Sequence, residues 1–325
     1  MGQTSQPPLV ESLLDGDHAA LARAITRIEN RQEGYRELVS ALYRHAGDTE
    51  VIGITGSPGA GKSTLVDKLA KAYRDRGLAV GVIAVDPSSP FSGGAVLGDR
   101  IRMASTAGDM DVFFRSMSAR GNLGGLSTAT SDAIKALDAF GKDVVIVETV
   151  GAGQNEVDVV KTADTIAVLI PPASGDDVQM LKAGILEIGD VFVVNKADLA
   201  GADRTVKELR NMLDMRERTE GDWDPGIVET VATKSEGLED LLDAFDEHAD
   251  WLDDSGRRTE KRRERSAAEI RTLLRDDAAA VVERELERQG GIEQFVDAVE
   301  ANETDPYAIA ADLVGPLADC VDERT

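Results

Sequence analysis

The sequence predicts an α/β protein built on a mainly parallel, doubly wound sheet, with helices before the sheet and a helical extension after it. Three observations support this fold. Short apolar runs bounded by Gly or Asp recur through the middle of the chain. Helical patterns separate most of these runs, which is typical of parallel strands whose connecting helices cover both faces of a sheet. After Trp251, a long charged helical pattern replaces the strand patterns.

The order of elements begins with helices. Between Val10 and His45, apolar residues recur at spacings of three and four, which predicts two amphipathic helices. A strand at 50–55, a Gly-rich turn, a helix at 63–76 and a strand at 78–85 then form a β-loop-α-β unit, for which a right-handed crossover is expected. Further strands are predicted at 112–115, 143–148, 165–170, 191–195 and 227–231.

The last part of the chain is predicted to be a helical dimerisation extension. A charged amphipathic helix covers 257–289. Because one helix cannot bury its apolar stripe alone, it must pair with another subunit or fold back on the same chain. We therefore expect a homodimer, with the folded-back clamp as the alternative. The predicted domains are an N-terminal helical segment at 1–48, a sheet domain at 49–252 and the extension at 253–325.

Composition excludes some classes of partner. The 325 residues include 60 Asp and Glu against 36 Lys and Arg, which gives a formal net charge of −24. A surface this acidic should repel nucleic acids and anionic membranes. The spread of the acidic excess along the chain suggests adaptation to high salt, and an ordinary acidic protein is the alternative.

Other features predict a cytoplasmic protein. Cys320 is the single cysteine, so no intramolecular disulfide can form. No apolar run approaches the about 18 residues needed to span a membrane. The first residues also lack the basic region and apolar segment of a signal peptide.

The Gly-rich turn matches a phosphate-binding loop. Residues 56–63 read GSPGAGKS, which fits G-x-x-x-x-G-K-[ST] between a strand and a helix. In such a loop, backbone N–H groups and the helix N-terminus surround a phosphate. Lys62 would reach the β- and γ-phosphates, and the Ser63 hydroxyl would bind Mg²⁺. The predicted binding residues are Gly56, Ser57, Pro58, Gly59, Ala60, Gly61, Lys62, Ser63 and Thr64.

A second motif predicts which base is bound. The strand at 191–195 runs into Asn195, Lys196, Ala197 and Asp198, the pattern N-K-x-D. The carboxylate of Asp198 can accept hydrogen bonds from N1–H and the exocyclic amine of guanine, whereas adenine offers no such pair of donors. An unpaired buried carboxylate is costly, so the motif favours GTP and GDP.

Three acidic residues lie where a metal ion would be expected. Asp86 and Glu148 end predicted strands, and Asp99 follows in an LGD sequence. Carboxylates at the carboxyl ends of parallel strands point towards the ligand crevice, so the predicted Mg²⁺ ligands are these three residues with Ser63. The Gly151 amide would meet the γ-phosphate. Alternatively, Asp86 caps the turn before Pro87 and Asp99 lies on a solvated helix.

Together, these motifs resemble those of the methylmalonyl-CoA mutase-associated GTPases, the MeaB/ArgK-type proteins of the SIMIBI class of P-loop GTPases. The similarity covers essentially the whole chain. The segments that carry it are GSPGAGKST at 56–64, AVDPSS at 84–89, GGAVLGDRIRM at 93–103, VETVGAGQ at 147–154, PPASGDDVQMLKAGILEIGD at 171–190 and VVNKAD at 193–198.

The resemblance implies a homodimeric GTPase that binds an adenosylcobalamin-dependent acyl-CoA mutase. Its GTP cycle would gate cofactor delivery and protect or reactivate the mutase. Asp86, Asp99 and Glu148 fall on the family's metal and switch acids, and Lys182 falls on a position thought to couple the nucleotide to the partner. The backbone of Ala232 is expected to support guanine, although Val231-Ala232 replaces the usual Ser-Ala.

Hydrolysis by the isolated chain is expected to be slow. No Gln directly follows Gly151, and Gln154 stands three residues on. We therefore expect acceleration when a partner orders Asp99, Gln154 or Lys182, which join Lys62 as the predicted catalytic residues. The three histidines are scattered, which argues against a transition-metal site. The alternative function is an ArgK-type kinase or ATPase linked to amino-acid transport, although a kinase has no need to select guanine.

Overall fold

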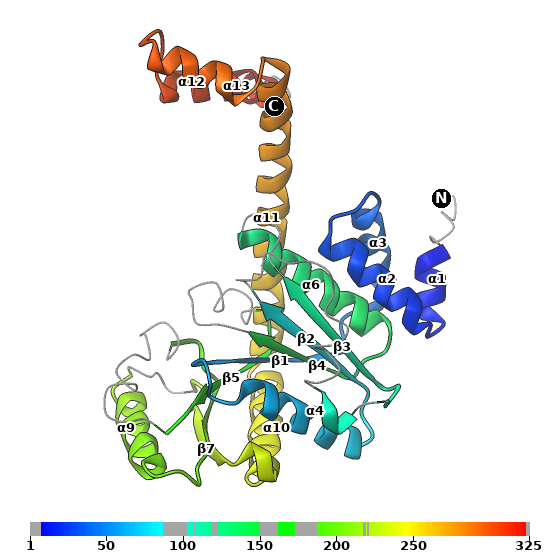
Figure 1. The fold of residues 1–325 in the computed structure, drawn as a ribbon, viewed down its shortest axis with the longest axis vertical. Coiled ribbons are helices and arrows are strands. Elements are labelled where there is room, and N and C mark those ends of the chain that lie inside the picture. The colour runs from blue at the N-terminus through cyan, green and yellow to red at the C-terminus, as the bar shows by residue number, and fades with distance from the viewer. Residues whose placement is uncertain are drawn as a thin grey trace. The chain divides into compact units, whose positions relative to one another are not determined.

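The computed structural model describes residues 8–86, 103–106, 108–118, 123–149, 162–172, 187–216, 219 and 221–322; for Asp86, Ser118, 123–127 and 317–322 it describes the backbone alone. The chain divides into two compact units, Met1–Lys261 and Arg262–Thr325. The first unit contains a seven-stranded sheet with the order β3-β2-β4-β1-β5-β6-β7 (Figure 1). Every pair of neighbouring strands is parallel, which confirms the predicted α/β fold.

Each strand falls on an apolar run that the sequence singled out. The central strands β4, β1 and β5 are buried almost throughout, as expected of a sheet covered on both faces. The strands are β1 Glu50–Gly56, β2 Val80–Asp86, β3 Val112–Ser118, β4 Val144–Thr149, β5 Thr165–Ile170, β6 Val191–Asn195 and β7 Gly226–Thr230.

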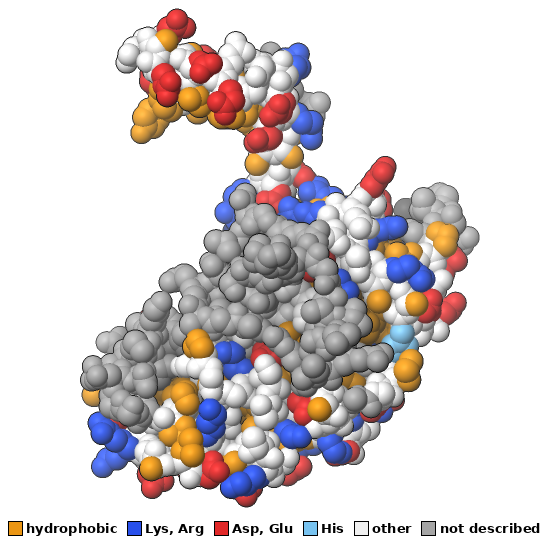
Figure 2. All heavy atoms as spheres, viewed as in Figure 1, with side chains coloured by type: hydrophobic (Ala, Val, Ile, Leu, Met, Phe, Trp, Pro, Cys, Tyr) orange, Lys and Arg blue, Asp and Glu red, His pale blue; other side chains and the backbone are white. Residues whose placement is uncertain are grey.

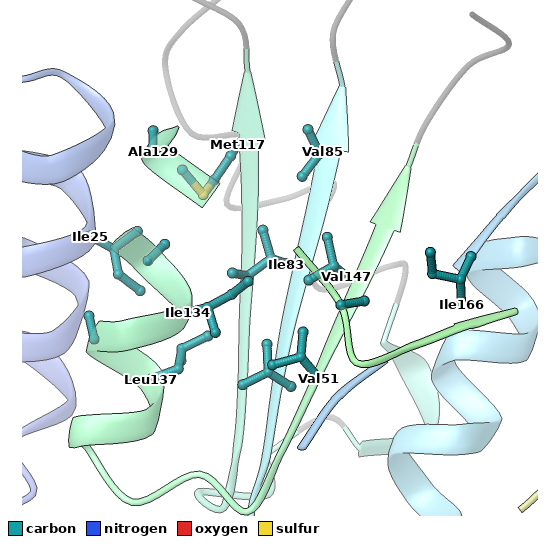
Figure 3. Close-up of a cluster of buried hydrophobic side chains, with 14 of the residues drawn as sticks. Ile25, Val51, Ile83, Val85, Met117, Ala129, Ile134, Leu137, Val147 and Ile166 are labelled. Carbon is teal, nitrogen blue, oxygen red and sulfur yellow. The ribbon is translucent and has the colours of Figure 1, made fainter. Parts of the chain in front are cut away.

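Two hydrophobic cores lie on the two faces of the sheet. Side chains alternate along each strand, so Val145 and Val147 of β4 enter one core while Val144 and Ile146 enter the other. On the first face lie α6 (Leu123–Ala139), α9 (Ala202–Asp214) and the N-terminal helices. Figure 3 shows side chains of α6 between the sheet and Ile25 of the N-terminal helices. On the second lie α4 (Lys62–Asp75) and α10 (Leu238–Asp254).

The N-terminal segment forms three helices, so the prediction of two was wrong. They are α1 (Pro8–Leu14), α2 (His18–Glu29) and α3 (Tyr35–Leu42), followed by the 3₁₀ turn η1 (Tyr43–His45). Gly16 has φ +86°, which ends α1, and the Asp17 side chain accepts a hydrogen bond from the Ala19 amide at 2.8 Å, which begins α2. The repeated apolar spacing did not reveal this short break.

The second unit holds most of α11 (Arg257–Arg288) with α12 (Ile292–Glu300) and α13 (Pro306–Asp322). The extent of α11 agrees with the predicted long helix. Leu286 and Leu313 are buried, while Ile270, Leu274 and Tyr307 are exposed. In the described part of the chain, no helix is long and apolar enough to cross a membrane. The domain limits predicted at 48/49 and 252/253 remain predictions.

Candidate functional site

The Gly-rich turn lies between β1 and α4, at the carboxyl edge of the sheet. Gly56 has φ +136°, and a Cβ there would lie 2.1 Å from the carbonyl oxygen of Leu169 on β5. Gly61 has φ +95°, and a Cβ there would lie 2.4 Å from Nδ2 of Asn195. Both positions therefore require glycine, because the loop packs directly against its neighbours.

Lys62 begins α4 and reaches back into this turn. Its Nζ donates hydrogen bonds to the carbonyl oxygens of Gly56 at 2.6 Å and Ser57 at 3.2 Å. The side chain is buried. An ammonium enclosed by the turn and by the N-terminus of a helix favours an anionic group there, such as a phosphate.

Ser63 and Glu148, two of the predicted magnesium ligands, are in contact. Ser63 Oγ donates to Glu148 Oε1 at 2.5 Å, and Glu148 is 2 % exposed. The carboxylate reaches Ser63 because β4 pairs with β1 in a register that places Glu148 opposite Ile54. A hydroxyl and a carboxylate are hard oxygen donors of the kind that Mg²⁺ prefers, so this pair fits the expected ion.

The other predicted metal and switch residues are not placed. Asp86 ends β2, two strands from β1, but its side chain lies outside the described part of the structure. Asp99, Gly151, Gln154 and Lys182 lie outside the described residues. Among the described side chains, no group of three or more His, Cys, Asp or Glu is suited to holding a metal ion.

Asn195 connects three segments of the site. Its Nδ2 donates to the carbonyl oxygen of Ala60 at 2.7 Å. Its Oδ1 accepts from the Ala232 amide and from Thr230 Oγ1, both at 3.1 Å. The side chain is 2 % exposed. One buried amide therefore fixes the Gly-rich turn, the end of β6 and the loop after β7 relative to one another.

Lys196 and Asp198 continue this arrangement towards the surface. Lys196 Nζ donates to the carbonyl oxygen of Gly59 at 2.8 Å, with the backbone at φ +63°. The side chain of Asp198 is 40 % exposed, and its Oδ2 lies 3.1 Å from Lys234 Nζ. The hydrogen bond to Asp198 raises the pKa of Lys234. A carboxylate is thus held at the surface, two residues beyond the lysine that contacts the Gly-rich turn.

Two of these contacts were not predicted. Thr230 ends β7 and binds Asn195, and Lys234 lies in the 3₁₀ turn η3 (Ala232–Lys234) and binds Asp198. Their partners are 35 and 36 residues away in the chain, so no local spacing could have indicated them.

Comparisons with known proteins agree with the motifs. The family model described as methylmalonyl Co-A mutase-associated GTPase MeaB matches residues 21–287. A relative from Pyrococcus abyssi, whose name describes it as a GTPase, is 52 % identical over 308 residues, which cover 94 % of each chain. GTPase ArgK of Escherichia coli is 36 % identical over 277 residues, covering 82 % of this chain and 83 % of its own.

A solved structure shares the fold. The protein in it is named LAO/AO transport system kinase, and it superimposes with a TM-score of 0.72 at 26 % identity. The match covers 98 % of this chain and 99 % of the other. The parallel sheet with its surrounding helices is therefore that of a P-loop GTPase fold.

Proposed function

The chain belongs to the family of methylmalonyl-CoA mutase-associated GTPases, and from this membership we propose that it serves as the GTP-hydrolysing chaperone of an adenosylcobalamin-dependent acyl-CoA mutase. In this role it binds GTP or GDP, and the nucleotide state gates delivery of the intact cofactor and protects or reactivates the mutase. Methylmalonyl-CoA mutase is the partner that the family description favours.

The observation that carries the proposal is the network around Asn195. Three segments, far apart in sequence, meet at one buried side chain. Lys62 lies in the Gly-rich turn, and Asp198 follows Asn195 by three residues. A guanine nucleotide fits the chemistry of both residues, because the backbone amides and Lys62 suit phosphates while Asp198 suits the two donors of the base. The backbone of Ala232, whose amide donates to Asn195, is proposed to support the base.

Magnesium is the proposed metal ion. Ser63 and Glu148 would hold it, with Asp86 and Asp99 as further proposed ligands. When bound, it would neutralise phosphate charge during hydrolysis. Asp99, Gly151, Gln154 and Lys182 are proposed to form the part of the site that responds to the γ-phosphate. Turnover by the isolated chain is proposed to be slow, with the mutase as the accelerating partner.

Dimerisation is proposed to use the C-terminal helices. On α11, Ile270, Leu274 and Val281 stand four and seven residues apart, which is helical spacing, and each is exposed. Figure 2 shows hydrophobic side chains gathered along the helices of the second unit. Ile270→Glu combined with Leu274→Glu should lower the measured mass in solution from a dimer to a monomer. An unchanged mass would remove these residues from the interface.

Nucleotide selection tests the proposed function directly. Calorimetric titration in concentrated KCl with Mg²⁺ should give much tighter binding of GTP and GDP than of ATP. Asp198→Asn should reverse the preference from GTP to xanthosine triphosphate, because xanthine replaces the exocyclic amine with a carbonyl that an amide can donate to. Equal binding of guanosine and adenosine nucleotides would overturn the proposal.

The partner is tested by capture from the native cells. The full chain, loaded with a non-hydrolysable GTP analogue, should retain a B12-dependent mutase that mass spectrometry can identify. The protein of the similar solved structure is named as a transport system kinase, which keeps one alternative in view. Recovery of a transporter component instead of a mutase would favour that alternative.

A further inference from the structure

Lys234 contacts the carboxylate of Asp198, which is proposed to recognise the guanine base. Its Nζ is 3.1 Å from Asp198 Oδ2, and the two side chains are 53 % and 40 % exposed. We propose that Lys234 is a specificity-determining positioning residue, which holds the Asp198 carboxylate in the orientation that accepts the two guanine donors. This inference rests on the proposed function, because it takes Asp198 to be the residue that recognises the base.

The loop that carries Lys234 has a fixed conformation. Val231 and Glu236 form an isolated antiparallel bridge, and η3 lies between them. The turn is completed by Ser235 at φ +58° and Gly237 at φ +71°, where a Cβ would lie 2.0 Å from the carbonyl oxygen of Glu229. The backbone of Lys234 is therefore set by the fold rather than by its ion pair.

Two hydrogen bonds fix this loop to the segment that carries Asp198. The Ala232 amide donates to Asn195 Oδ1 at 3.1 Å, and the Ala197 amide donates to the Thr230 carbonyl oxygen at 3.0 Å. Val231 has a hydrocarbon side chain, which cannot donate a hydrogen bond to Asp198, and it is buried. Within the described structure, the side-chain donor bound to Asp198 is thus Lys234.

The chemistry of the pair leaves room for the base. An ionised carboxylate has two oxygens and about four acceptor positions, so an ammonium on Oδ2 leaves positions on both oxygens for N1–H and the amine. The terminal torsion of an Asp side chain is broad, and an ion pair with a lysine whose backbone is fixed narrows it. Holding the carboxylate in its binding orientation before the nucleotide arrives strengthens binding, because less conformational freedom is lost.

The test compares matched variants of the full chain. Dissociation constants for GTP, GDP and ATP are measured by calorimetry with Mg²⁺ for the wild type and for Lys234→Met, Lys234→Arg, Asp198→Ala and the double variant Lys234→Met/Asp198→Ala. Lys71→Met is the control, because Lys71 forms an exposed ion pair with Asp75 at 2.8 Å on α4. Thermal unfolding verifies that each variant is folded.

Loss of Lys234 should weaken recognition of the guanine base and leave binding of the phosphates unchanged. Lys234→Met should weaken GTP and GDP binding equally, by about three- to tenfold, and leave ATP binding unchanged. Lys234→Arg should restore most of the loss because it keeps the cation, and Lys71→Met should have no effect. In the Asp198→Ala background, Lys234→Met should cause no further loss, since the group it positions is absent.

Two different failures can be told apart. If Asp198→Ala abolishes the preference for GTP over ATP while Lys234→Met binds GTP as the wild type does, the role of Lys234 is wrong and the proposed function stands. An equal loss for GTP and ATP in Lys234→Met would also overturn it, since that result indicates general attraction to phosphates. If Asp198→Ala leaves the preference unchanged, base recognition by Asp198 fails and the role of Lys234 fails with it.

Discussion

The two ends of the parallel sheet use polar side chains in different ways. At the carboxyl ends of the strands, Lys62 and Asn195 bind backbone groups of neighbouring loops. At the amino ends, Glu50 begins β1 and His248 of α10 binds Thr165, which begins β5. Burial raises the pKa of Glu50 to about 7 and lowers the pKa of His248 to about 3. Glu50 and His248 are thus both mainly neutral near pH 6.

The amino end joins helices to the sheet. Trp251 of α10 stacks on His248 with 5.6 Å between ring centroids. Lys261 of α11 donates to the carbonyl oxygen of Asp164 at 2.9 Å. His248 Nε2 lies 3.4 Å from Asp190 Oδ1, and the low pKa of the histidine means that this contact is not an ion pair near neutral pH. The site and the attachment of the helices therefore depend on separate polar groups. Substitutions at the carboxyl end should change nucleotide affinity, and substitutions at the amino end should change stability.

The largest effect is expected at the carboxyl end, from Lys62→Ala. Removing the ammonium should weaken GTP binding by about 100-fold, the range of a charge-assisted hydrogen bond to phosphate. The melting temperature should change by no more than about 3 °C. Titration with a fluorescent GTP analogue and thermal unfolding measure the two quantities. A large loss of stability with little loss of affinity would contradict the separation of the two ends.

At the amino end, Glu50→Gln should change stability and leave nucleotide affinity alone. Because burial raises the pKa of Glu50, the folded state of the wild type holds a proton that the unfolded state releases above the ordinary value of 4.5. The free energy of unfolding of the wild type therefore falls as pH rises from about 4.5 to about 7. Glutamine does not titrate, so the variant should become more stable than the wild type by about 1–3 kcal/mol at pH 8.

Urea unfolding of both proteins at pH 5 and pH 8 provides the measurement. Glu37→Gln is the control, because Glu37 is exposed on α3. The prediction fails if the stability difference between Glu50→Gln and the wild type is the same at both pH values.

Asn195→Ala should affect both properties, because this buried side chain joins the loops of the site. It would leave the Ala60 carbonyl oxygen and the Ala232 amide without their present partner. We expect a loss of about 1–2 kcal/mol in the free energy of unfolding and about tenfold in GTP affinity. Chemical unfolding and calorimetry on one preparation test this. A loss confined to either quantity would show that Asn195 does not link site and fold.

The smallest effect is expected from Lys261→Met at the amino end. Burial raises the pKa of Asp190, and the Lys261 charge partly opposes that rise. Losing the cation should cost about 0.5–1 kcal/mol of stability near neutral pH, and less in acid, where Asp190 becomes protonated. GTP affinity should not change. A drop in GTP affinity, measured by the same titration, would show that the first turns of α11 are coupled to the nucleotide site.

Sequence patterns predicted the strands better than the helices at the N-terminus. The strands were found because each contains a short run of apolar residues that ends at Gly or a polar residue. The break between α1 and α2 was missed, because it depends on the backbone of Gly16 and the cap formed by Asp17. The phosphate-binding turn was predicted from its spacing, because all of its groups lie within eight consecutive residues.

The local sequence alone was enough to predict the strands, the Gly-rich turn and the N-K-x-D segment, since hydrophobic periodicity and glycine positions act over a few residues. Only folding decided which groups meet: Ser63 with Glu148 across 85 residues, and Asp198 with Lys234 across 36. Such pairs depend on strand order and on register, which burial of both faces of the sheet fixes for the whole molecule at once. No short stretch of the chain contains that information.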